Sequence, residues 1–170
     1  MTLDLNAPDL AVIALGGNLP GGYPTLAQTL AAAAARLAHE GFTVLRVSRW
    51  WRSAAWPNPD DPPFLNGVVL ARTDQEPEDA LRALHRIEAA FGRRRGAPNG
   101  PRTLDLDLIA LGRRVLEEPS MILPHPRAGE RLFVMGPLAE IAPGWRHPVT
   151  GETAEVLASR ATIGQDAVPQ

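Results

Sequence analysis

Two residue types are missing from this chain of 170 residues, and their absence excludes several kinds of site. The chain has no cysteine, so disulfides, thiolate nucleophiles, cysteine-ligated zinc and iron–sulfur clusters are excluded. It also has no lysine, and all 17 basic residues are arginine. Schiff-base chemistry and a lysine-dependent phosphate loop are therefore excluded too. Any anion that this protein binds must be held by arginine, histidine, backbone N–H groups or a metal ion.

Neither a strong excess of positive charge nor a long apolar segment is present. The formal net charge is −2, which argues against a general nucleic-acid-binding surface. No run of about 18 apolar residues occurs, the length that a membrane-spanning helix needs. The N-terminal segment contains Asp4 and Asp9 but no basic residue, unlike a secretory signal peptide. We therefore expect a cytoplasmic protein with no nucleic-acid and no membrane partner.

Hydrophobic periodicity predicts six regular elements before residue 112. They are strands at 11–15, 42–51, 64–73 and 103–111, and helices at 25–41 and 77–92. The first helix has clear end signals, because Thr25 and Gln28 have the spacing of a capping box and Gly41 follows the last turn. The second helix has Pro77 in its first turn and Gly92 at its end.

The order of these elements is strand, helix, strand, strand, helix, strand. This order predicts an α+β, ferredoxin-like βαββαβ fold, in which an antiparallel four-stranded sheet carries both helices on one face. A C-terminal extension follows, with further helices expected near 129–141 and 153–160. We expect a single domain over residues 1–170, with a core at about 11–157 and flexible segments at 1–9 and 163–170.

Two aspartates placed two residues apart give the clearest chemical signal. Asp105 and Asp107 lie on the predicted strand 103–111, with a leucine on each side of both. Because side chains alternate across a strand, both carboxylates leave the same face, with Cα atoms about 7 Å apart, while the leucines enter the core. Oxygen ligands favour Mg²⁺, which takes its remaining ligands from water and phosphates. The pair therefore predicts a metal site that also engages a phosphate-type group.

An arginine-rich segment comes directly before these aspartates. It contains Arg93, Arg94, Arg95 and Arg102 among glycines and prolines, and no acidic residue. A loop of this composition can close over the phosphates that the metal holds. An exposed aspartate pair or an arginine run is by itself more often a solvated surface. Their combination at the start of one strand favours metal-assisted transfer of a phosphate-type group.

Two further clusters are compatible with a ligand but do not require one. His125 lies between two prolines that hold the backbone extended, where it could donate to a phosphate oxygen; a capped surface turn is the alternative. Phe64 and Asn66 share one face of a predicted strand, where a ring could stack on a flat heterocycle and the amide could bond its edge. A half-buried sheet surface would have the same pattern.

Taken in order, these motifs resemble those of the 6-hydroxymethyl-7,8-dihydropterin pyrophosphokinase family of folate biosynthesis. The most specific match is Gly100-Pro101-Arg102-Thr103-Leu104-Asp105-Leu106-Asp107. Further matching segments follow in the family's order, at 14–19, 64–66, 88–95, 123–133 and 137–143. The resemblance extends over about residues 11–157.

The resemblance implies an ATP-dependent diphosphotransferase, and we expect a monomer. ATP would donate its pyrophosphoryl group to the hydroxymethyl oxygen of 6-hydroxymethyl-7,8-dihydropterin and leave as AMP, with two Mg²⁺ ions bound by Asp105 and Asp107. The implied catalytic residues are Arg93, Arg95, Arg102, Asp105 and Asp107. The implied ATP-binding residues are His85, Glu88, Arg102, Leu108, His125 and Arg131. The implied pterin-binding residues are Ser53, Ala54, Trp56, Phe64, Asn66, Asp105 and Phe133.

Two other classes of function remain open on the residues alone. One is a non-catalytic ferredoxin-like RNA-binding module, which would present stacking aromatic side chains from its central strands. The segments 11–15 and 103–111 contain no aromatic residue, which counts against it. The other is a different two-metal phosphoryl-transfer enzyme, such as a phosphatase or a nuclease. Formation of AMP that requires the pterin alcohol would separate the three.

Overall fold

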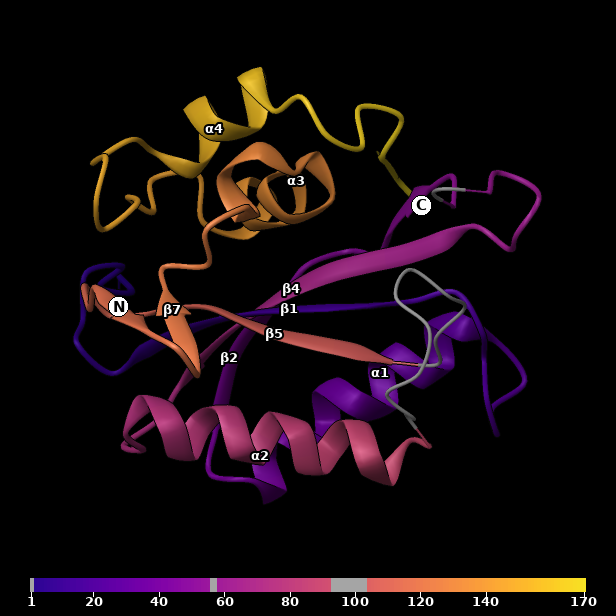
Figure 1. Cartoon of the computed structure of the whole chain (residues 1–170), viewed down its shortest axis with the longest axis horizontal. Helices are drawn as coiled ribbons and strands as arrows, with labels where there is room; N and C mark the ends of the chain where they lie inside the picture. The colour runs from indigo at the N-terminus through magenta and orange to yellow at the C-terminus, as the bar shows by residue number, and fades with distance from the viewer. Residues whose placement is uncertain (1, 56–57, 93–103) are drawn as a thin grey trace.

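An antiparallel sheet with helices on both faces organises the chain in the computed structural model, which describes residues 2–55, 58–92 and 104–170 (Figure 1). The main sheet contains β1 (Leu10–Gly17), β2 (Thr43–Val47), β3 (Trp51–Ser53), β4 (Phe64–Arg72), β5 (Asp105–Leu111) and β8 (Val168–Pro169). A separate hairpin consists of β6 (Leu116–Glu118) and β7 (Met121–Leu123). The α-helices of the described residues are α1 (Leu26–Arg36), α2 (Pro77–Ala90), α3 (Leu132–Ile141) and α4 (Ala154–Arg160). Short 3₁₀ turns occur at Leu37–His39 and Ala128–Glu130.

The strands of the main sheet follow the order β5-β1-β4-β3-β8, and β2 pairs with the other end of β4. Every pair of these strands is antiparallel. The register places Trp51, Asn66, Gly16 and Asp105 in one row across four neighbouring strands. This row brings together residues that are far apart in the sequence.

The predicted helix ends are confirmed where the local signals were strongest. The Thr25 hydroxyl accepts from the Gln28 backbone N–H at 3.2 Å, and the Gln28 side-chain oxygen accepts from the Thr25 N–H at 3.1 Å. This reciprocal pair satisfies two N–H groups at the start of α1. Helix α2 begins at Pro77, and Gly92 with φ +82° follows its end. The expected C-terminal helices are confirmed as α3 and α4.

Two apolar layers hold the sheet, one on each face. Helices α1 and α2 cover the first face, where Ile13, Leu30 and Leu84 are fully buried. Helices α3 and α4 cover the opposite face, which buries Met135 and Trp145 (Figure 1). Each such side chain stabilises the fold by about 2 kcal/mol relative to an exposed one. Helices α1 and α2 therefore lie together on one face, as expected for the two helices of a βαββαβ unit. Helices α3 and α4 lie on the other face.

The predicted strand 42–51 is interrupted, which is a correction to the sequence prediction. It forms β2 and β3 with a break at Ser48, whose hydroxyl accepts from the Val68 N–H at 2.9 Å while its own N–H donates to the Val68 carbonyl. The Trp50 ring crosses Gly67, where a Cβ would lie 2.4 Å from the ring. An irregularity of this kind bends a strand and shifts its register. The register of β2 on β4 is therefore not continued in β3, where Trp51 pairs with Asn66.

The end of the chain, which we expected to be flexible, pairs with the main sheet in the structure. Val168–Pro169 forms β8 on the edge of the sheet beside β3, and Ala167 is buried. The Leu132 N–H donates to the Ile163 carbonyl at 2.8 Å. Backbone pairing and a buried methyl group hold this segment in place, and neither leaves a periodic signal in a short sequence. No helix within the described ranges has the length and apolarity needed to span a bilayer.

His147 provides a pH-dependent contribution to stability. Its Nδ1 accepts from the backbone N–H groups of Val149 and Thr150 at 3.2 and 3.3 Å. Burial lowers the pKa of His147 below its ordinary 6.5; Glu152 opposes this shift and Arg113 adds to it. The unfolded chain therefore takes up the proton first, so that stability is complete above about pH 6.5 and falls as the pH drops through that region.

We expect the melting temperature of His147→Asn to fall less than that of the wild type between about pH 7.5 and 5.5. The asparagine oxygen can accept from Val149, but it does not titrate. Melting curves at both pH values measure the difference, and the other titrating groups are common to both proteins. Equal losses in the two proteins would show that His147 does not contribute.

Candidate active site

The two aspartates of β5 lie on one face of the sheet, as predicted. Asp105 and Asp107 are half-buried and alternate with buried leucines that belong to the α1–α2 core. They pair with Gly16 and Ala14 of β1. The carboxylates therefore leave the sheet on the face opposite α1 and α2, and their position close together on one strand suits a shared cation.

The donor set at this position consists of oxygen atoms. Within the described ranges, no group of three or more His, Asp or Glu side chains is arranged to hold a metal ion. Asp105 and Asp107 would therefore supply only a minority of the ligands of a bound metal ion. This fits Mg²⁺, which usually keeps several waters and completes its shell with substrate phosphates.

Gly16 makes room for Asn66 beside the aspartates. A Cβ on Gly16 would lie 2.3 Å from the Asn66 side-chain oxygen, so the amide crosses the sheet above this glycine. Asn66 and Asp105 flank Gly16 in the same row. The strand predicted at 11–15 is longer in the structure, where Gly16 and Gly17 also belong to β1.

Glu88 supports β5 from the other side. It projects from α2, is only 3% exposed, and its Oε2 accepts from the Leu106 N–H at 2.9 Å. This N–H belongs to the residue between the two aspartates. His85, one turn earlier, is exposed, and Leu108 is buried in the core. Their expected contacts with ATP stay predictions, whereas the structure shows Glu88 in contact with the backbone of β5.

His125 lies within electrostatic range of Asp105. The backbone N–H of His125 donates to the Ile109 carbonyl at 2.8 Å, and the imidazole Nδ1 accepts from the backbone N–H of Arg127 at 3.2 Å. Burial, together with Arg131 and Arg127, lowers the pKa of His125, while Asp105 opposes the shift. The imidazole is therefore neutral at pH 7. With Nδ1 acting as an acceptor, Nε2 carries the proton and is available as a donor.

The described residues expected to bind a pterin lie on four elements, β3, β4, β5 and α3, and directly after β3. Phe64 is half-buried at the start of β4 and pairs with the buried Ser53 of β3. Phe133 lies in the first turn of α3, with the Arg131 guanidinium 5.7 Å from its ring centroid. The Ala54 N–H donates to a carboxylate oxygen of Asp166 at 2.7 Å. Four predicted site residues lie outside the described residues: Trp56, Arg93, Arg95 and Arg102.

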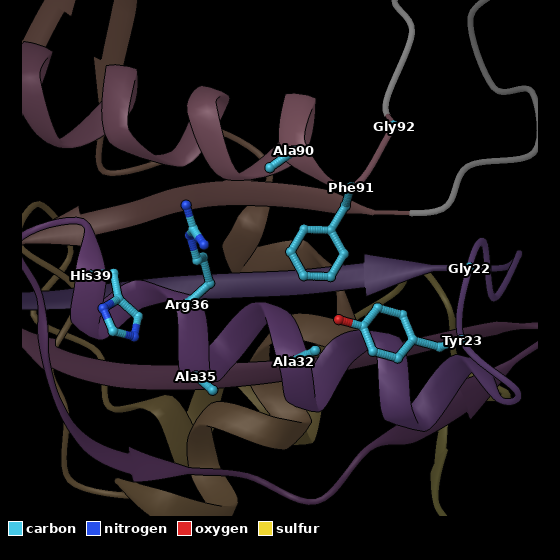
Figure 2. Close-up of a pocket in the computed structure, with 9 residues that line it drawn as sticks. All are labelled: Gly22, Tyr23, Ala32, Ala35, Arg36, His39, Ala90, Phe91 and Gly92. Carbon is cyan, nitrogen blue, oxygen red and sulfur yellow. The ribbon is translucent and has the colours of Figure 1, made fainter.

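A cavity of about 700 Å³ lies elsewhere, between α1 and the end of α2 (Figure 2). It contains none of the predicted site residues. At one end the rings of Tyr23 and Phe91 are stacked, with centroids 6.0 Å apart and planes at 15°. This pair joins the segment after β1 to the end of α2. Because α1 and α2 cover the other face of the sheet, the cavity is separate from the aspartates.

Comparisons with known proteins identify the family. Residues 12–143 match the family model described as 7,8-dihydro-6-hydroxymethylpterin-pyrophosphokinase (HPPK). A 2-amino-4-hydroxy-6-hydroxymethyldihydropteridine pyrophosphokinase of Synechocystis sp. is 45% identical over 143 residues, which cover 84% of this chain and 71% of that protein. The protein of the same name from Bacillus subtilis is 39% identical, covering 78% of each chain. That of Methylorubrum extorquens is 36% identical, covering 93% of this chain and 98% of the other.

Solved structures support the same fold. A Plasmodium falciparum HPPK-DHPS structure aligns with a TM-score of 0.67 at 14% identity, covering 91% of this chain. This chain spans 44% of that longer protein, so the likeness concerns the fold alone. The family match over most of the chain and the identities of 36–45% lead to one conclusion. The chain belongs to the HPPK family, whose members are named pyrophosphokinases.

Proposed function

We propose that this chain transfers the pyrophosphoryl group of ATP to the hydroxymethyl oxygen of 6-hydroxymethyl-7,8-dihydropterin, in folate biosynthesis. The products are AMP and the dihydropterin pyrophosphate. Family membership supports the reaction. The structural observation that carries it is the row of Asn66, Gly16 and Asp105, with Asp107 next on the same face. This row offers an amide for a flat polar ligand beside carboxylates for a metal–phosphate complex.

Asp105 and Asp107 are the proposed ligands of two Mg²⁺ ions. Bound metal supplies charge neutralisation for the polyphosphate. Without it, the two carboxylates would repel the phosphates of ATP. Asp105 is also the nearer of the two to Asn66, and its carboxylate is therefore the one expected to lie beside the pterin hydroxymethyl group.

His125 and Arg131 are the proposed phosphate contacts within the described residues. The charges of Arg131 and Asp105 both act on the His125 imidazole. The neutral imidazole donates one hydrogen bond, and the guanidinium adds a fixed positive charge. Arg93, Arg95 and Arg102 are proposed to neutralise the remaining charge as AMP leaves. His85, Glu88 and Leu108 stay proposals as ATP-binding residues.

The pterin is proposed to lie beside Asn66, between aromatic side chains. The Asn66 amide offers both a donor and an acceptor to an amide-like ring edge. Phe64 and Phe133 are the rings proposed to stack on it. The backbone at Ser53 and Ala54, with Trp56, is proposed to complete the recognition of the polar edge.

The finer description of the fold is part of the proposal. The order β5-β1-β4 with β2 and β3 on the far side of β4, and α1 with α2 on one face, supports a ferredoxin-like arrangement. A single domain and a monomer acting in the cytoplasm stay predictions.

The test is incubation of the purified chain with ATP, Mg²⁺ and the pterin alcohol, with separation of the nucleotides. We expect AMP and the pterin pyrophosphate in equal amounts, and no AMP when the pterin is left out. ATP turnover without the acceptor would instead indicate a phosphatase. Absence of turnover combined with affinity for RNA would support the binding-module alternative.

A further inference from the structure

The segment after α4 contacts two parts of the proposed pterin site. We call residues 162–170 the C-terminal strap. In Figure 1 it is the yellow segment that runs from α4 toward the end of the chain, along the face that carries α3. It is bonded to the start of α3 at one end and to β3 at the other.

At its first contact the strap lies against Phe133. The Ile163 N–H donates to the Glu130 carbonyl at 2.9 Å, and the Ile163 carbonyl accepts from Leu132 at 2.8 Å. Gly164 has φ +71°, and a Cβ there would lie 2.5 Å from the Phe133 ring. A glycine is therefore required both by its backbone conformation and by the closeness of the ring.

At its second contact the strap holds the end of β3. Asp166 accepts from the Ala54 N–H at 2.7 Å. Val168 pairs with Arg52, and the Gln170 N–H donates to the Trp50 carbonyl at 2.9 Å. The peptide unit that contains the Ala54 N–H also contains the Ser53 carbonyl. Because that unit is planar and trans, fixing the N–H toward the strap points the Ser53 carbonyl away from it.

We propose that Asp166 is a positioning residue for the pterin, acting through the Ser53–Ala54 peptide. Gly164 contributes to the same strap by allowing the Phe133 ring to lie beside it. The proposal rests on the proposed function, because Ser53, Ala54 and Phe133 are pterin contacts only in that reaction. Because the strap bonds to Ala54 and lies against Phe133, both proposed pterin contacts, its effect is expected on the pterin rather than on ATP.

The test compares Asp166→Ala with Asp166→Asn. We expect the KM for the pterin to rise roughly fivefold in Asp166→Ala, as for loss of a charge-assisted hydrogen bond at an exposed site. The KM for ATP should stay within about twofold. Asparagine keeps an acceptor oxygen, so Asp166→Asn should restore most of the pterin affinity. Hydrogen exchange at the Ala54 amide should be faster in the alanine variant and near wild type in the asparagine variant.

A matched control is Glu155→Ala, an exposed acid in the first turn of α4. It should leave both KM values unchanged. Gly164→Ala is a second, independent variant, and it should also raise the KM for the pterin selectively. Unchanged pterin KM in Asp166→Ala, or equal rises for both substrates, would overturn the positioning role while the wild type remains active. A wild type that makes no pterin-dependent AMP would overturn the proposed function, and the role of the strap with it.

Discussion

Asp107→Ala should lower kcat by at least about a hundredfold, in line with losses seen when one charge-stabilising group is removed. Asp107 is half-buried on the face of β5 opposite α1 and α2, and its neighbours Leu106 and Leu108 hold the strand in the core. The change removes a proposed metal ligand without opening a cavity. We therefore expect the far-ultraviolet circular dichroism spectrum and the melting temperature to stay close to those of the wild type.

Asp74→Ala is the matched control, because Asp74 is an exposed aspartate in the turn after β4. Its turnover should equal that of the wild type. Raising the Mg²⁺ concentration should recover part of the activity of Asp107→Asn, which keeps one oxygen ligand. Wild-type turnover in Asp107→Ala, with an intact fold, would refute the metal assignment.

Glu88→Ala should reduce both stability and turnover. The Leu106 N–H loses its acceptor in a buried position, which costs about 2–3 kcal/mol of unfolding free energy. Alanine is itself a good helix former, so the loss does not arise from α2. Because Leu106 lies between the two aspartates, we also expect kcat to fall at least roughly tenfold, as the carboxylates lose their alignment. Denaturant titration and steady-state kinetics measure the two effects.

Glu88→Gln separates a supporting role from direct binding of ATP. The amide oxygen can still accept from Leu106, so stability should be largely restored. Glu78→Ala, at an exposed position in the first turn of the same helix, should change neither quantity. If Glu88→Ala instead raised only the KM for ATP and left stability unchanged, Glu88 would be a ligand contact and not a support for β5.

Local signals predicted most of the elements correctly. The capping box at Thr25, Pro77 in the first turn of α2 and the alternation around Asp105 each depend on residues a few positions apart, and each is confirmed. The same alternation placed both aspartates on one face. The pairing of Asn66 with Gly16 could not be predicted, because register depends on contacts between strands about 50 residues apart.

The features that sequence reasoning missed depend on distant contacts. The break at Ser48 arises from hydrogen bonds to Val68, and the contact between Asp166 and Ala54 spans 112 positions. The hairpin β6–β7 is short, and its turn at Pro119 and Ser120 was its only local indication. Four residues with roles assigned by resemblance lie outside the described residues: Arg93, Arg95, Arg102 and Trp56.

The pairing of Val168–Pro169 with β3 also affects how the molecule meets its neighbours. Pro169 lacks an N–H, so the outermost strand at this side offers an incomplete ladder to any incoming strand. On the other side, the Ile109 carbonyl and the Leu106 N–H of β5 are already bonded to His125 and Glu88. The sheet margins at β8 and at β5 are thereby blunted against edge-to-edge aggregation, a protection that loss of β8 would remove beside β3.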